Sequence, residues 1–235
     1  MHVSLKSFPA KILLCAIFAF TALKPAQAQP FWPYAYRLYF VPSGSMENTV
    51  QLGDRIIADA HIYEHRAPRN QEIAIFEAPD AALLSPVPGQ HPVFIKRVVG
   101  VPQDVVYMIN RQLFRNGKKV EEPYCDWDDN TAPSSFAPRY SYDMKIVNGI
   151  VYSREYLDEG EIGPWSRNGV AVAEAEQKKI SLAKPGAVPA NEFLMLDDHR
   201  SNSNDSHVFG FVSRGAFEAR ALLVCWPIMH WKVLN

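Results

Sequence analysis

The feature that most constrains the fold is a series of short apolar runs separated by turn residues. Between residues 41 and 109 the runs read RIIADA, EIAIFEAP, PVFIKRVVGVP and DVVYMI. Few windows here keep the 3.6-residue period of a helix, and short apolar runs bounded by turn formers are typical of β-strands. After Gly186 strand-like runs return as EFLML, FGFV and ALLVCWPIMHWKV. The sequence therefore predicts a mostly β fold.

Two segments interrupt this pattern. The stretch 79–92 holds four prolines and a glycine, which predicts a loop between strands. Residues 121–185 are rich in turn formers and aromatic residues, which indicates an inserted lobe. Within the lobe, the run 170–182 (VAVAEAEQKKISL) predicts one modest helix, although its apolar start fits a strand equally well.

The N-terminal segment, residues 1–28, contains an uncharged apolar run, 12–23, between Lys11 and Lys24. As a helix this run would span about 18 Å, short of the roughly 30 Å hydrocarbon core of a bilayer. It could be a short membrane anchor, or a cleavable signal whose cleavage site is Ala-Gln-Ala at 26–28. Both alternatives export the rest of the chain.

Charge and cysteine content exclude several functions. The chain has 24 Lys and Arg against 25 Asp and Glu, a formal net charge of -1, with the basic residues scattered. Such a chain has no basic field for a phosphate backbone, so no nucleic-acid partner is expected. Cys125 and Cys225 are the only cysteines beyond the N-terminal run, and no C-x-x-C spacing exists. This argues against a zinc ribbon and leaves a disulfide between the two open.

Two separated segments could together activate a nucleophile. The run 41–46 (VPSGSM) places Ser43 and Ser45 on either side of a glycine, and a serine hydroxyl needs a base to become nucleophilic. No Gly-x-Ser-x-Gly elbow is present, so an α/β-hydrolase triad has little support. In VFIKRVV the strand period puts Phe94, Lys96 and Val98 on one face. Apolar neighbours penalise an ammonium and favour the neutral amine that a base requires, although a plain turn and a snorkelling lysine explain the same residues.

A third segment, 197–210 (DDHRSNSNDSHVFG), is a dense polar loop between apolar runs. Its carboxylates and imidazoles could ligate a metal, but the glycine and bidentate glutamate of a calcium loop are absent. We therefore expect no metal and no cofactor. The loop is either a solvated turn or a hydrogen-bonded network behind a catalytic pair.

Taken together, these segments resemble bacterial type I signal peptidases (leader peptidases). PSGSM resembles the nucleophile motif, GDRII the following strand, FIKRVVGVPQD the lysine motif and DDHRSNSNDSHVFG the C-terminal motif, in the family's order. The similarity covers about residues 39–110 and 186–225. It implies a β-rich signal-peptidase-like catalytic domain with an inserted lobe, preceded by one short N-terminal apolar helix.

The resemblance assigns roles to individual residues. Ser45 would be the nucleophile and Lys96 its general base, which makes a Ser-Lys dyad. The oxyanion hole would combine the Ser45 backbone N–H with the Ser43 hydroxyl. Ser203 would orient the lysine, and Asp205 would be a structural carboxylate beside it. The positions near the small apolar pockets that select Ala-x-Ala substrates would be Val41, Pro42, Met46, Phe94 and Ile95.

Three departures from the family pattern stand out. The family's Gly-Asp-Asn reads Asp197-Asp198-His199 here, its arginine paired with the aspartate is His207, and the glycine of its Pro-Gly-Asp turn is Gln103. Neither Ser45 nor Lys96 is affected. A His207–Asp205 pair would be titratable where an arginine pair is not.

The implied function is removal of N-terminal signal peptides from exported precursor proteins after small-x-small sites. The family's topology favours residues 1–28 as a retained anchor in the lipid bilayer of the bacterial inner membrane. Residues 29–235 would then be a peptidase domain on the outer (periplasmic) face, with its core at about 39–120 and 186–235 and the lobe at about 121–185. Two alternatives are a specialised peptidase for conjugative pilin maturation and a non-enzymatic exported β-rich binding module.

Overall fold

The computed structural model describes residues 35–83, 92–127, 141–156 and 161–234. The expected N-terminal helix and most of the expected loop at 79–92 lie outside these residues. Within the described ranges no helix is both long and apolar enough to cross a membrane.

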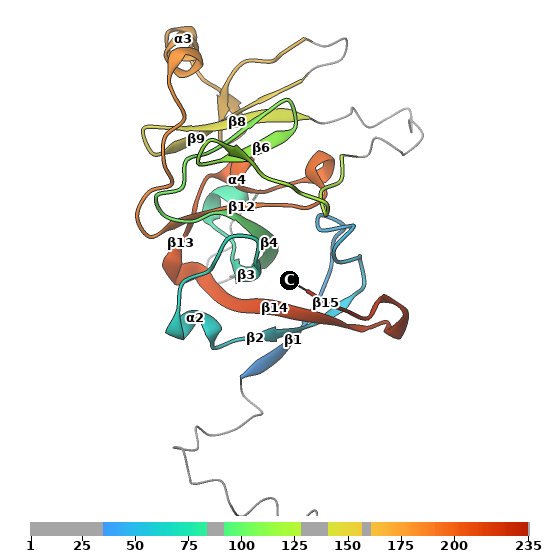
Figure 1. Cartoon of the computed structure of the whole chain (residues 1–235). Coiled ribbons are helices and arrows are strands. Elements are labelled where there is room, and N and C mark those ends of the chain that lie inside the picture. Colours follow the sequence, from blue (N-terminus) through green and yellow to red (C-terminus); the bar gives the residue numbers. More distant parts are fainter. Residues whose placement is uncertain (1–34, 84–91, 128–140, 157–160, 235) are drawn as a thin grey trace, which may run out of the picture. The chain divides into compact units, whose positions relative to one another are not determined.

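The first of two β-sheets is built from both ends of the described chain (Figure 1). Its eight strands run in the order β1, β2, β14, β3, β4, β12 and β13, with β15 paired to β14. Their bounds are β1 Tyr36–Phe40, β2 Arg55–Asp59, β3 Ile73–Glu77, β4 Val93–Gly100, β12 Glu192–Leu196, β13 Val212–Ser213, β14 Phe217–Trp226 and β15 Lys232–Val233.

The second sheet comes from the middle of the chain, and its seven strands run in the order β11, β10, β9, β8, β5, β6 and β7. Their bounds are β5 Val106–Ile109, β6 Gln112–Arg115, β7 Lys118–Lys119, β8 Tyr142–Val147, β9 Ile150–Glu155, β10 Ser166–Arg167 and β11 Val170–Ala171. The helices are short: α2 Ile62–His65, α3 Glu174–Leu182 and α4 Ser206–Phe209, with 3-10 turns η1 Asp80–Ala82, η3 Arg200–Asn202, η4 Arg214–Ala216 and η5 Ile228–His230. The predicted mostly β fold is confirmed.

Strand β12 shows why some apolar runs are continuous and do not alternate with polar residues. Leu194 and Leu196 pack in one buried cluster with residues of the second sheet, whereas Phe193 and Met195 pack in another. A strand that is buried on both faces needs apolar residues at every position. The continuous run EFLML therefore marks a central strand of the core, and the residues that follow it enter the interior.

Two sequence predictions are refined by the structure. The run 170–182, for which the sequence left a helix and a strand open, contains both, since strand β11 precedes helix α3. The predicted strand at 209–212 is wrong in its first part, because α4 ends at Phe209 and Gly210 adopts a φ of 87°. The Asp205 side chain accepts a hydrogen bond from the His207 N–H and caps this helical turn, which overrides the apolar pattern. Cys125 and Cys225 are free thiols.

Candidate active site

The segment that carries Ser45 is fixed by the loop after β12. The His199 backbone N–H donates to the Ser45 carbonyl at 3.1 Å, and His199 Nδ1 lies 3.2 Å from the Gly44 carbonyl, which can only accept. One turn further, the Thr49 hydroxyl donates to Asp198 at 2.5 Å. Met46 is buried and its carbonyl accepts from the Val50 N–H at 2.8 Å, which closes a helical turn after the serine. Ser45 itself is partly exposed.

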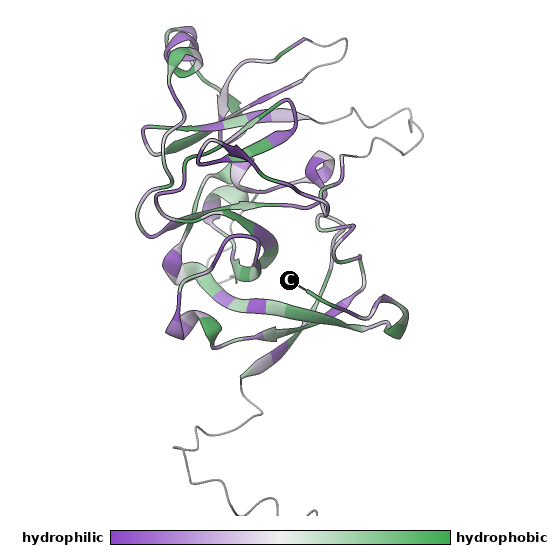
Figure 2. Ribbon diagram, viewed as in Figure 1, coloured by the Kyte–Doolittle hydropathy of each residue, from purple (hydrophilic) through white to green (hydrophobic). Residues whose placement is uncertain are grey.

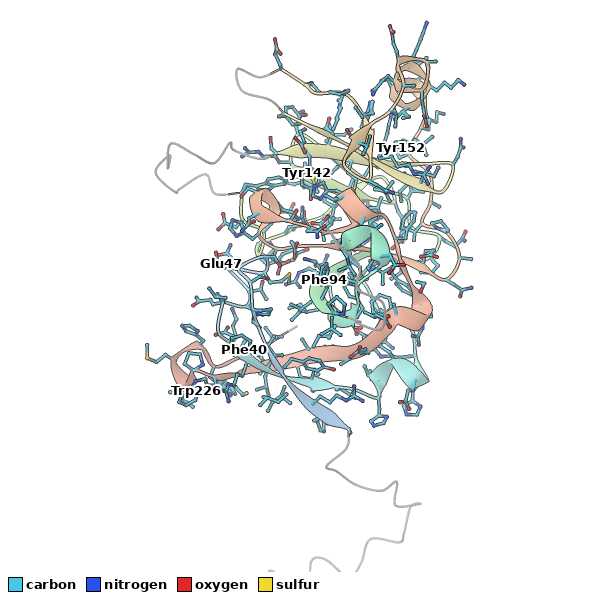
Figure 3. All side chains as sticks on the ribbon, turned by 180° about the vertical axis from the view of Figure 1, so that it is seen from behind. Phe40, Glu47, Phe94, Tyr142, Tyr152 and Trp226 are labelled. Atoms are coloured by element: carbon cyan, nitrogen blue, oxygen red, sulfur yellow. The ribbon has the colours of Figure 1, made fainter. Side chains whose placement is uncertain are left out.

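Lys96 reaches Ser45 from the middle of β4. Its Nζ lies 3.4 Å from Ser45 Oγ and 5.0 Å from the centre of the Phe94 ring, as the shared strand face predicts. Lys96 is 4% exposed, so little water reaches its amine. A serine hydroxyl and a lysine amine therefore meet within proton-transfer reach in a largely desolvated place. Figure 3 shows Phe94 close to the centre of the two-sheet unit.

Asp197 also contacts the Lys96 amine, which the sequence did not predict. Because Leu196, the last residue of β12, is paired with Arg97 of β4, the residue that follows β12 comes beside Lys96. The two Asp197 carboxylate oxygens lie 2.6 and 2.7 Å from Lys96 Nζ. Burial raises the pKa of Asp197, Asp205 raises it further, and Lys96 and a hydrogen bond from Ser45 oppose the rise, so that the pKa is about 7.

A second buried ion pair lies next to the first. Arg97 donates from Nε and Nη2 to the two oxygens of Asp198, at 2.8 and 2.6 Å, and from Nη1 to the Gln71 carbonyl at 2.8 Å. This bidentate pair joins β4 to the loop after β12 and, through Thr49, to the serine segment. Asp197 and Asp198, the first two residues of the polar loop, thus bind Lys96 and Arg97, which are consecutive in β4.

The predicted His207–Asp205 pair is present. His207 Nδ1 and the His207 backbone N–H lie 2.8 and 2.9 Å from Asp205 Oδ1, and the Asp197 N–H donates to Asp205 Oδ2 at 3.0 Å. Burial raises the pKa of Asp205, but the interaction with His207 and these hydrogen bonds outweigh it and lower the pKa to about 2. The His207 ring stacks on Tyr142 of β8 at 3.9 Å, so this pair also joins the loop to the second sheet.

The other predicted site residues are placed as follows. Ser203 Oγ is buried and, among the described residues, has no hydrogen-bond partner, so its role in orienting the lysine stays a prediction. Ser43 is exposed and precedes the nucleophile segment. Of the five expected substrate positions, Val41 and Met46 are buried in one apolar cluster and Ile95 packs against it, whereas Phe94 is half-buried in a neighbouring cluster and Pro42 is exposed.

Sequence reasoning offered loop 197–210 as a network behind a catalytic pair but gave Asp197, Asp198 and His199 no individual role, and it missed Arg97. Their roles depend on strand register, which puts Leu196 opposite Arg97, and no local pattern encodes it. A signal did exist at two of these positions. Asp197 and His199 are departures from the pattern that the resemblance supplies, and both turn out to contact the serine segment or its partner lysine.

Comparison with known proteins identifies the family of the chain. A family model described as "Signal peptidase, peptidase S26" matches residues 13–226. A probable signal peptidase I-2 of Synechocystis is 30% identical over 196 residues, which are 83% of this chain and 66% of the relative. Signal peptidase I of Leptolyngbya laminosa is 29% identical over 189 residues, 80% of this chain and 68% of the relative. The chain thus spans about two thirds of the length of these relatives.

A crystal structure of a signal peptidase I from Enterococcus faecalis V583 covers 66% of this chain and 97% of its own, with a TM-score of 0.36 and 22% identity. That overlap is too low to bear on the site. The family match and the curated relatives define the class, a hydrolase of the serine peptidase type. The chain belongs to the signal peptidase family, peptidase S26.

Proposed function

We propose that this chain is a signal peptidase I. It removes N-terminal signal peptides from exported precursor proteins after small-x-small sites, with Ser45 as nucleophile and Lys96 as general base. The observation that carries the proposal is the 3.4 Å approach of Lys96 Nζ to Ser45 Oγ in a chain of this family.

In the proposed reaction Ser45 Oγ attacks the scissile carbonyl while Lys96 accepts its proton and later delivers it to the leaving amine. The Ser45 backbone N–H has no acceptor among the described residues, so it is available with the Ser43 hydroxyl as an oxyanion donor. The apolar cluster of Val41, Met46 and Ile95 lies around the serine segment. The small apolar pockets that the resemblance implies at this place would admit alanine and reject large side chains.

We further propose that residues 1–28 anchor the peptidase in the inner membrane, with residues 29–235 on the outer face. An exposed apolar surface at one end of the first sheet supports a lipid partner. In the sheet register Arg55 of β2 is opposite Phe40 on β1 and opposite Trp226 on β14. Both aromatic residues lie at this end of the sheet in Figure 3. The strand end and turn that follow are hydrophobic in Figure 2, and Met229 and Trp231 there are exposed. Exposed aromatic and apolar groups of this kind suit a bilayer interface.

The test is cleavage of a precursor with an Ala-x-Ala site by the full chain in detergent, with the cut position read by mass spectrometry. The proposal predicts a single cut after the second small residue. No cleavage, or cleavage that survives Ser45→Ala, would refute it. A panel of unrelated precursors then separates a general signal peptidase, which cuts most of them, from a specialised pilin-maturation enzyme, which cuts one or few.

A further inference from the structure

Asp197 has a position that the Ser-Lys dyad does not explain. The resemblance puts glycine here, and a glycine leaves the lysine amine free to face the serine. In this chain both carboxylate oxygens of Asp197 hold the Lys96 amine at 2.6 and 2.7 Å, closer than the 3.4 Å from that amine to Ser45 Oγ. The Ser45 side chain acts on the same carboxylate, since it is among the groups that lower the pKa of Asp197. The Lys96 amine therefore contacts both the Ser45 hydroxyl and the Asp197 carboxylate.

A purely structural role does not distinguish Asp197 from its neighbour. Asp198 already binds Arg97 bidentately and joins β4 to the loop. A buried ion pair contributes little net stability compared with apolar residues of the same size. What sets Asp197 apart is that it holds the same amine that contacts the nucleophile.

We propose that Asp197 is part of the catalytic base: Lys96 and Asp197 share one proton, and the pair as a unit accepts the proton of Ser45. This inference rests on the proposed function and deepens it. A dyad without the carboxylate is active only after its lysine has lost its own proton. The pair, in contrast, can accept a proton while the lysine is still protonated, because the ionised Asp197 carboxylate has a free site for it.

The pair gains one proton and gives one back in each half of the reaction. In the competent state the pair carries one titratable proton and is electrically neutral overall. As Ser45 Oγ forms a bond to the scissile carbonyl carbon, the carbonyl electron pair moves to its oxygen and the Oγ proton moves to the pair, which now holds two protons. When the C–N bond breaks, one of these protons goes to the leaving amine and the pair returns to its first state. Water repeats the sequence and releases Ser45 from the acyl-enzyme.

The charges around Asp197 suit this role. Lys96 faces it from β4, Asp205 from the start of α4 with His207 behind it, and Arg200 of η3 donates from Nε to the Asp197 carbonyl at 2.8 Å. Burial first, and then Asp205, raise the pKa of Asp197 to about 7 against the opposing effect of Lys96. A base is most effective when its pKa lies near the working pH. Because the two groups are coupled, they titrate as a pair. The doubly protonated pair then loses one proton near neutral pH and becomes competent.

The test is the pH profile of kcat/KM for an Ala-x-Ala precursor, measured with the full chain in detergent. The wild type should gain activity with rising pH through about 7. In Asp197→Asn the lysine must release its own proton, and an amine does so at higher pH than a carboxyl group. The rise should therefore move at least about one pH unit to the alkaline side, with activity recovering there. Asp197→Gly should show the same shift if the asparagine variant does not fold.

The matched control is Asp143→Asn, which breaks the buried Arg154–Asp143 pair of the second sheet and no contact of the site. It should lower stability and leave the pH of the rise in place. A profile of Asp197→Asn that coincides with the wild type, or moves to the acid side, would overturn the inference. Loss of activity in Ser45→Ala together with such a profile would leave the proposed function intact. Cleavage by Ser45→Ala would instead remove the proposed function itself.

Discussion

Replacing Asp205 by asparagine should weaken the fold in a way that depends on pH. The Asp205 carboxylate is fully buried and accepts from His207 and from the Asp197 N–H. Its pKa is about 2 in the folded protein, against an ordinary value of 3.8. A shift of this size corresponds to about 2 kcal/mol of stability at neutral pH.

The direction follows from the sign of the shift. A carboxyl whose folded pKa is lowered contributes stability above its unfolded pKa and loses it as pH falls through the folded value. The wild-type advantage over Asp205→Asn should therefore be fully present at pH 6. At pH 3, which lies between the folded pKa of about 2 and the ordinary value of 3.8, this advantage should be smaller by about 1 kcal/mol.

Urea unfolding at pH 6 and pH 3, followed by circular dichroism in detergent, measures both differences. Glu121→Gln is the matched control, because Glu121 is exposed and its 3.5 Å contact with Lys119 is a surface pair. That substitution should change the unfolding free energy by less than about 0.5 kcal/mol at either pH. A difference between Asp205→Asn and wild type that stays constant or grows at pH 3 would refute the reasoning.

Two further predictions concern a turn and the oxyanion hole. Gln103 adopts a φ of 75°, a left-handed conformation that disfavours side chains, so Gln103→Gly should raise the unfolding free energy by up to about 1 kcal/mol in urea titrations, and a loss of stability would contradict this. Ser43→Ala should lower kcat on the order of a hundredfold with an unchanged circular dichroism spectrum, because it removes one oxyanion donor and leaves the backbone N–H. An unchanged kcat would exclude Ser43 from the oxyanion hole.

The fold was predictable because its signals are local. Short apolar runs and turn residues specify strands wherever they occur, and EFLML marked a strand that is buried on both faces. The failure at 209–212 has a local cause of a different kind, since one side chain, Asp205, caps a helical turn that apolar periodicity does not detect.

The site was predictable only in part, because its geometry depends on pairing between distant strands. Strand period put Lys96 on one face with Phe94, and the structure agrees. The contact between Asp197 and that lysine follows from the register of β12 on β4, which no single segment contains. For Ser203 the motif implies a partner, whereas its buried hydroxyl finds none among the described residues.

The most direct test of the central claim is the cleavage rate of Ser45→Ala, Lys96→Met and the double variant on one Ala-x-Ala precursor. Residues that act as a unit lose activity non-additively. Each single substitution should lower turnover at least about a thousandfold, and the double variant should be little slower than either. Near-normal cleavage by Lys96→Met, with its fold confirmed by circular dichroism, would contradict the account.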